Sequence, residues 1–191
     1  MVIPKRNFEV VSVGLKSIYH PHGYKDPIQL DGPDDVFHYI EPDFEGLDMS
    51  KWPSKALTCV IDARDIRDNI PKYKKGSHIG TNAIIWEHLV RKNRWFVIES
   101  LQKLHHFLTQ APCDSDEPLL VMCCCDWGKH KPVGMAWIIS TLLRHVGHPT
   151  HVCHMNRTRW SKTQSCGRNP CGECDRSNAQ KKALKAEVRA M

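Results

Sequence analysis

The chain has 191 residues, of which 41% are hydrophobic and 25% charged, as in one globular domain with room for a small appendage. No apolar run approaches the ~20 residues of a membrane-spanning helix, and residues 1–6 lack the apolar stretch of a secretory signal. Nine cysteines without such a signal indicate a cytoplasmic or otherwise intracellular, reducing compartment, where cysteines are buried, catalytic or metal-bound. We therefore expect neither a membrane partner nor a secreted, disulfide-bonded protein.

The formal net charge of +6 resides in the C-terminal part of the chain. Residues 155–191 hold nine Lys and Arg against three Asp and Glu, whereas residues 1–154 balance to zero. A basic tail on a neutral body predicts an acidic partner, and RNA is the macromolecular partner that we favour. The alternative is a solvated helix face with ordinary surface lysines.

The first half of the chain predicts two strands separated by an irregular stretch. Phe8–Leu15 alternates and is rich in Val, which predicts a strand, and Leu57–Asp62 is a short apolar run typical of a buried strand. Residues 16–55 between them are dense in Pro, Gly and Asp, which are turn formers. A helix should begin near Thr81, which is a plausible N-cap.

The second half predicts strands and helices in alternation. The expected elements are a helix over Arg94–Gln110, a buried strand over Leu119–Cys125, a buried helix over Pro132–Val146, a strand over Thr150–Cys153 and a basic helix over Asn178–Ala190. This order predicts an α/β fold with a small, mostly parallel sheet and flanking helices.

The segment between Cys125 and Pro132 predicts an anion-binding loop. A buried strand ends at Cys125, Gly128 permits a close approach of the backbone, and a helix begins at about Pro132. Backbone N–H groups and a helix N-terminus then lie at the carboxyl end of a strand, where phosphate groups bind in α/β proteins. Lys129, His130 and Lys131 would add positive charge. The alternative is a purely structural turn with exposed lysines.

The loop Cys124–Val133 (CCDWGKHKPV) resembles the GCTGGxHRSV loop of the C-terminal domain of the RapZ family of RNase adapter and nucleotide-binding proteins. Cys125, Gly128, His130 and Lys131 fall on the Cys, the second loop Gly, the His and the Arg of that motif. Four shorter segments resemble the same domain in the same order: SVGLK (Ser12–Lys16), DARDIRDNIP (Asp62–Pro71), HIGTN (His78–Asn82) and HMNR (His154–Arg157).

The chain also departs from the RapZ pattern. Lys131 replaces Arg and Pro132 replaces Ser, so bidentate phosphate recognition is lost while a cation remains, and Asn156 stands where the family has Asp. No GxxxxGK[ST] occurs, so the activity of the family's N-terminal P-loop domain does not carry over. The resemblance implies an RNA-binding or regulatory adapter domain over residues 8–157 that binds RNA, a nucleotide or a phosphorylated metabolite. Residues 158–191 then form a Cys-rich, basic extension.

Arg64 follows the second predicted strand and could contact the ligand, with Asp62 orienting its side chain. The alternative is a surface ion pair. The predicted ligand-binding residues are Asp62, Arg64, Cys125, Asp126, Trp127, Gly128, Lys129, His130, Lys131 and Arg157.

A cysteine-dependent phosphatase is the main alternative function. Cys125 and Lys131 are similar in spacing to the C-x5-R loop of those enzymes, in which a thiolate attacks phosphorus while Arg holds two phosphate oxygens. Lys cannot offer that fork, and a general acid is not identified, although Asp65 and Asp68 are available. We expect Cys125 to contact the ligand without acting as a nucleophile.

The C-terminal extension predicts a structural zinc site. Cys166, Cys171 and Cys174 supply three thiolates, two of them in a C-x2-C pair, within a turn-rich segment. Cys153, His154 or His151 would be the fourth ligand. The segment PCGEC is similar to half of the zinc-deaminase signature, but the H-x-E that those enzymes require is missing. The alternatives are unligated cysteines or a zinc-stabilised protein-interaction module.

Overall fold

The computed structural model describes residues 5–15, 57–67, 78–111, 117–155 and 178–191. They form an α/β fold around a four-stranded sheet in which all neighbouring strands are parallel. This confirms the predicted fold class and its parallel sheet. The strands run in the order β2-β3-β1-β4, with bounds β1 Phe8–Gly14, β2 Thr58–Asp62, β3 Leu119–Cys125 and β4 Thr150–His154.

The register of the strands brings their carboxyl ends to one edge of the sheet. Gly14 pairs with Cys125, and Asp62 pairs with Cys124. β4 lies on the other side of β1, where Ser12 pairs with His154. Residues that follow β2 and β3 are therefore neighbours in space although about 60 positions separate them in the sequence.

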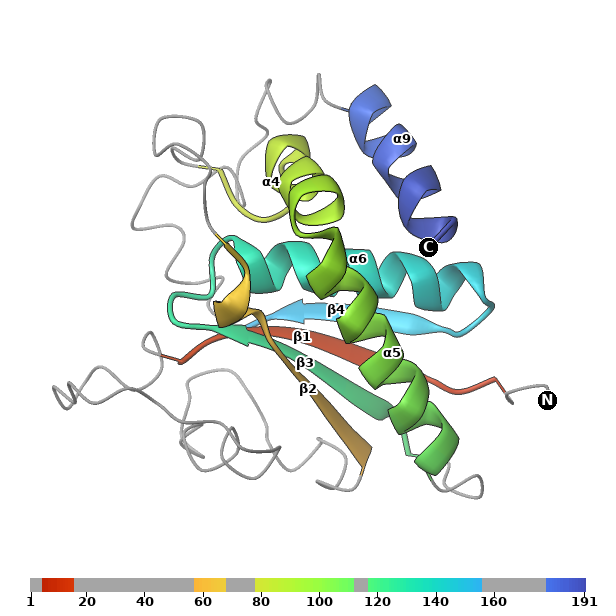
Figure 1. The fold of residues 1–191 in the computed structure, drawn as a ribbon. Coiled ribbons are helices and arrows are strands. Elements are labelled where there is room, and N and C mark those ends of the chain that lie inside the picture. Colours follow the sequence, from red (N-terminus) through yellow and green to blue (C-terminus); the bar gives the residue numbers. More distant parts are fainter. Residues whose placement is uncertain (1–4, 16–56, 68–77, 112–116, 156–177) are drawn as a thin grey trace, which may run out of the picture.

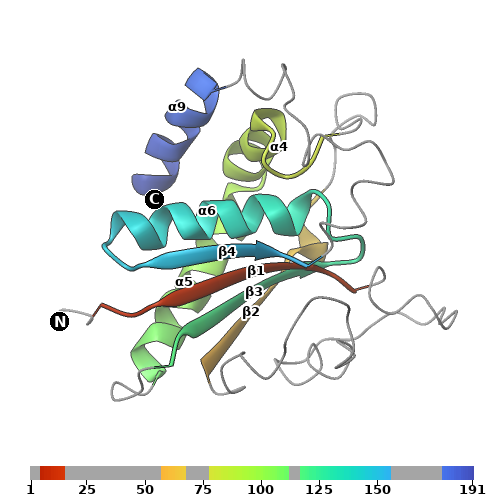
Figure 2. The ribbon, with the colours of Figure 1, turned by 180° about the vertical axis from the view of Figure 1, so that it is seen from behind.

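The helices pack on one face of the sheet. Phe8 and Val10 of β1 and Val121 of β3 share one core cluster with Phe96 of α5 and Ile138 of α6. Figures 1 and 2 show α4, α6 and α9 on the same side of the sheet. The bounds are α4 Ala83–Glu87, α5 Arg94–Gln110, α6 Lys131–His145 and α9 Asn178–Arg189, with a 3-10 turn η3 at Ala63–Asp65 and a π-helical turn η4 at His88–Lys92.

The first predicted helix begins one residue later than predicted. Its N-cap is Asn82 rather than Thr81, because the Asn82 side chain accepts a hydrogen bond of 2.9 Å from the backbone N–H of Ile84. The helix then widens into η4 and stops at the buried Asn93, whose side-chain amide donates to the carbonyl oxygens of Arg67 and His88. Asn93 thereby ties this bend to the segment after β2.

The C-terminal helix packs against the same core. Leu184 and Val188 of α9 are fully buried. Arg91 of η4 forms ion pairs with Glu187 of α9 and with Glu87 of α4. One face of the basic helix is therefore apolar and docked. No helix in the parts of the chain that the structure describes is both long and apolar enough to cross a membrane.

Candidate functional site

The loop between β3 and α6 lies at the carboxyl edge of the sheet, as predicted. β3 ends at Cys125, and α6 begins at Lys131 with a proline in its first turn. Gly128 has a φ of 69°, a left-handed conformation that glycine adopts without strain. His130 is the N-cap of α6, and its side chain makes no capping hydrogen bond.

Two segments that are distant in the sequence contact this loop closely. A Cβ atom on Gly14, at the end of β1, would lie only 2.5 Å from the backbone nitrogen of Gly128. On the other side, the N–H of Gly80 donates to the carbonyl oxygen of Lys129 at 3.0 Å, and the His130 ring bonds to the carbonyl oxygen of His78 at 2.9 Å. These contacts leave the loop little freedom. In the sequence, the segments that contain Gly14 and Gly80 were noted only for their resemblance to the RapZ domain. No sequence pattern predicted that they contact this loop.

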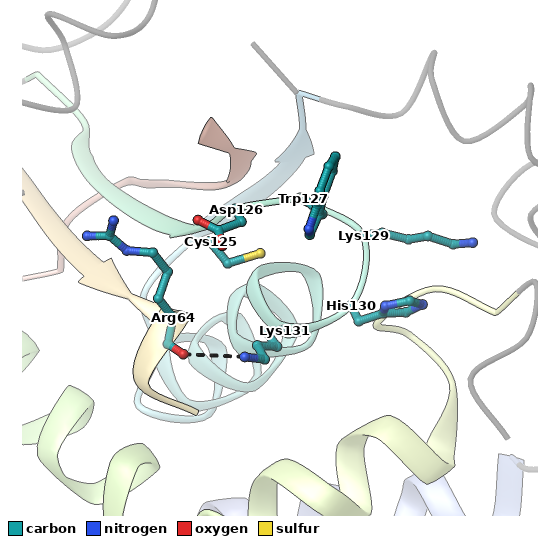
Figure 3. A pocket seen from close by; sticks show the side chains of 7 residues that line it. All are labelled: Arg64, Cys125, Asp126, Trp127, Lys129, His130 and Lys131. Carbon is teal, nitrogen blue, oxygen red and sulfur yellow. Dashed lines mark hydrogen bonds between the residues drawn. The ribbon is translucent and has the colours of Figure 1, made fainter. Parts of the chain in front are cut away.

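A pocket of about 140 Å³ opens at this loop (Figure 3). Three basic side chains, those of Arg64, Lys129 and Lys131, contribute to its described lining, against a single carboxylate, that of Asp126. The lining residues are Arg64, Cys125, Asp126, Trp127, Lys129, His130 and Lys131. The structure thus brings together seven of the ten predicted ligand-binding residues. The other three do not line it: Gly128 is buried within the loop, the Asp62 carboxylate accepts hydrogen bonds from Arg64, and Arg157 lies outside the described residues.

Arg64 reaches the pocket from η3, the turn that follows β2. The Asp62 carboxylate accepts hydrogen bonds from the Arg64 backbone N–H at 3.0 Å and from its Nε at 2.9 and 2.8 Å. The 3-10 turn, of which Asp62 is the N-cap, brings the two residues together. The hydrogen bond with Asp62 raises the pKa of Arg64, so the guanidinium keeps its charge, while the carboxylate offsets part of it.

Lys131 joins the start of α6 to the same turn. Its Nζ donates to the carbonyl oxygen of Arg64 at 3.3 Å, the bond drawn in Figure 3. An ammonium group carries three donors, so this bond leaves donors that can face a ligand. The Lys131 side chain is therefore tied to the backbone of Arg64 at the pocket, and both residues are only partly exposed.

Cys125 is buried at the inner end of the pocket. Its Sγ accepts a hydrogen bond of 3.3 Å from the backbone N–H of Gly128. Burial raises the pKa of Cys125, and hydrogen bonds from the Gly128 and Trp127 backbones, together with the charge of Lys131, only partly oppose that shift. The group is thus a neutral thiol at physiological pH, whereas the attacking cysteine of a phosphatase is a thiolate.

The predicted zinc ligands Cys166, Cys171 and Cys174 lie outside the described residues. The three candidate fourth ligands are described, on β4. His154 Nδ1 hydrogen-bonds to Ser12 Oγ at 2.7 Å, His151 Nδ1 pairs with Glu9 at 2.6 Å, and Cys153 is half-buried between them. Within the described ranges, no three His, Cys, Asp or Glu side chains cluster as a metal site would require.

Fold and pocket together define a parallel α/β protein with a small, cation-lined pocket at the carboxyl edge of its sheet. In comparisons with known proteins, no family model matches the chain and no curated protein matches it. The pocket itself is therefore the basis on which a function can be assigned.

Proposed function

We propose that the pocket binds the phosphate group of a ligand and that the protein acts as a binding or regulatory domain rather than as an enzyme. The observation that carries this proposal is the gathering of Arg64, Lys129 and Lys131 around one small pocket. Guanidinium and ammonium groups are the side chains that proteins use for phosphate. Among the described lining residues Asp126 supplies the single carboxylate, and Asp62 is already engaged by Arg64.

The start of α6 adds to the attraction for an anion. α6 has 15 residues, no acidic residue in its first turn and no side-chain cap. The N-terminus of such a helix carries a partial positive charge and presents backbone N–H groups. A bound phosphate would supply the cap that the His130 side chain does not provide.

The test is a titration with inorganic phosphate, followed by ³¹P NMR or calorimetry. A hydrogen bond to a charged group contributes about 1.5–3 kcal/mol, so Lys131→Ala should weaken binding roughly 10- to 150-fold. Lys92→Ala is the matched control, because Lys92 is an exposed lysine of η4 that does not line the pocket. Equal affinities in the two variants, or no binding by the unaltered protein, would contradict the proposal.

We favour RNA as the macromolecular source of the phosphate. This preference is supported by the charge of the C-terminal part and by the resemblance of the loop to the RapZ C-terminal domain. In α9, which docks through Leu184 and Val188, Lys182 is exposed and Lys181 and Lys185 are partly exposed. Each lysine that pairs with a phosphate of RNA contributes about 0.7–0.9 to the slope of log affinity against log salt. Neutralising Lys181, Lys182 and Lys185 should therefore flatten that slope, and an unchanged slope would exclude α9 from the interface.

A cysteine-dependent phosphatase is the second candidate, because Cys125 lines the pocket and its Sγ accepts a loop N–H. The raised pKa of Cys125 and the Lys at position 131 weigh against it. We expect no hydrolysis of an aryl phosphate by the protein. Turnover that Cys125→Ser abolishes, while phosphate affinity persists, would establish the enzyme instead.

We also propose a structural Zn²⁺ held by Cys166, Cys171 and Cys174, with Cys153, His154 or His151 as the fourth ligand. The spacing of the cysteines supports this proposal. Elemental analysis of reduced protein purified without added metal should find about one zinc per chain. Cys171→Ser should lower both the zinc content and the melting temperature. A stoichiometry near zero would refute the site.

A further inference from the structure

Trp127 is a large aromatic side chain that the fold leaves exposed. It is 65% exposed, whereas Trp86 in the core is 2% exposed. Burying a side chain of this size is strongly favourable, so the folded protein forgoes that gain at this position. The residue before it, Asp126, and the residue two before it, Cys125, both line the pocket. Trp127 lines the pocket as well, so the exposed indole belongs to the site rather than to an unrelated surface.

The backbone beneath the indole is fixed. A Cβ on Gly14 would lie 2.5 Å from the carbonyl carbon of Trp127, so β1 packs directly against this peptide. The Trp127 backbone also hydrogen-bonds to Cys125. An aromatic ring on an immobilised backbone loses little conformational entropy when it takes up a ligand, which is why such residues are frequent binding anchors.

The size of the pocket places most of any ligand outside it. Pockets that enclose a whole drug-sized ligand have volumes of about 300–1,000 Å³. The pocket at about 140 Å³ has room for a phosphate group and little more. Figure 3 shows the Cys125 sulfur between the side chains of Arg64 and Trp127. Because Trp127 also lines this pocket, its ring is near any group attached to a phosphate bound there.

We propose that Trp127 stacks on the nucleobase of the bound ligand, so that the site takes a nucleotide unit and not a bare phosphate or a phosphorylated sugar. This inference rests on the proposed phosphate pocket and specifies its ligand. Every nucleobase offers an aromatic face, and base–tryptophan stacking tolerates differences of sequence. The Asp126 carboxylate, which lies between Arg64 and Trp127 in Figure 3, is placed to accept a hydrogen bond from a ribose hydroxyl. The unit can come from a free mononucleotide or from single-stranded RNA.

The experiment compares four probes by calorimetry: inorganic phosphate, ribose 5-phosphate, adenosine 5′-monophosphate and a hexaadenylate without terminal phosphates. The unaltered protein should bind the mononucleotide roughly 5- to 150-fold more tightly than ribose 5-phosphate, the range expected for one stacked base. Trp127→Ala should abolish that difference, so that the mononucleotide and ribose 5-phosphate bind the variant with equal affinity. Trp127→Phe keeps an aromatic face and should retain most of the difference. Whichever of the mononucleotide and the hexaadenylate binds more tightly identifies the source of the nucleotide unit, provided that its binding depends on Trp127 in the same way.

The outcomes separate this inference from the proposed function. Equal binding of the mononucleotide and ribose 5-phosphate, with phosphate still bound, would refute stacking and leave the phosphate pocket standing. A sugar phosphate that binds most tightly and loses affinity in Trp127→Ala would overturn the nucleobase in favour of a sugar ring. If no phosphate compound binds, both proposals fall. Trp127→Ala and Trp127→Phe should melt within a few degrees of the unaltered protein, because the side chain is exposed.

Discussion

Replacing Gly14 with alanine should displace the anion-binding loop. The added Cβ would lie 2.5 Å from the Gly128 nitrogen and from the Trp127 carbonyl carbon, and 2.7 Å from the Gly128 Cα. These are backbone atoms, which cannot turn aside as the end of a side chain can. An ordinary contact requires roughly 3.4 Å, so the loop and β1 must separate by about 0.9 Å.

The displacement should affect both stability and binding. Forcing one extra methyl group into a packed site costs about 1–3 kcal/mol, which lowers the melting temperature of a chain of this length by roughly 2–12 °C. A shift of this size also moves the loop away from Arg64 and Lys131, which contact each other at the opposite wall. Losing one charge-assisted hydrogen bond should weaken phosphate binding at least tenfold.

Gly147→Ala is the control for lost stability alone. Gly147 follows the far end of α6, has a φ of 93°, and an added Cβ would meet only the Lys5 side chain at 3.7 Å. A left-handed alanine costs about 1–2 kcal/mol, so both variants should melt early. Phosphate titration at a temperature where both are folded should show weakened binding in Gly14→Ala alone. Unchanged phosphate affinity in a folded Gly14→Ala, or an equal weakening in the two variants, would refute the proposed role of Gly14.

Three further predictions concern charge and protonation. Asp126→Asn should tighten phosphate binding about fivefold, because repulsion by a nearby carboxylate weakens the binding free energy of the anion by about 1 kcal/mol even when screened by water. Phosphate titration measures this change. Because burial raises the pKa of Cys125, iodoacetamide near neutral pH should label this thiol slowly, and rapid labelling in peptide mass spectrometry would show that Cys125 is a thiolate. Burial lowers the pKa of His148, so this side chain takes up a proton at a higher pH in the unfolded chain than in the folded protein. The free energy of unfolding should therefore decrease below about pH 6.5. Urea denaturation should show a weaker decrease in His148→Phe.

The strands were the part of the fold that the sequence predicted best. Runs of buried Val, Leu and Cys in Phe8–Gly14 and Leu119–Cys125 are typical of parallel strands, which are covered on both faces. The strand order could not be predicted, because pairing of β1 with β4 depends on contacts more than 130 residues apart. The π-helical turn at His88–Lys92 was also missed. It depends on the bonds of Asn93 to Arg67, which no local pattern reveals.

The sequence predicted the anion-binding loop of the candidate site but not the segments that surround it. The charges of Lys129 and Lys131, and Gly128 before a helix, were visible in the sequence. The contact of Gly14 with the loop was not, because it arises from the register of two distant strands. Similarly, Leu184 and Val188 read as part of a basic helix, and only the packing of α9 shows that they complete the core.

The position of β1 has a consequence for synthesis of the chain. β1 leaves the ribosome before the other three strands of the sheet, yet its sheet neighbours are β3 and β4, and β2 is not one of them. At about 5–20 residues per second, β3 follows Gly14 by roughly 5–20 s. During that interval a Val-rich strand is apolar and unpaired, a form that chaperones bind and that aggregates. A message truncated before the codon for Leu119 would yield β1 and β2 without β3, the strand that lies between them in the sheet.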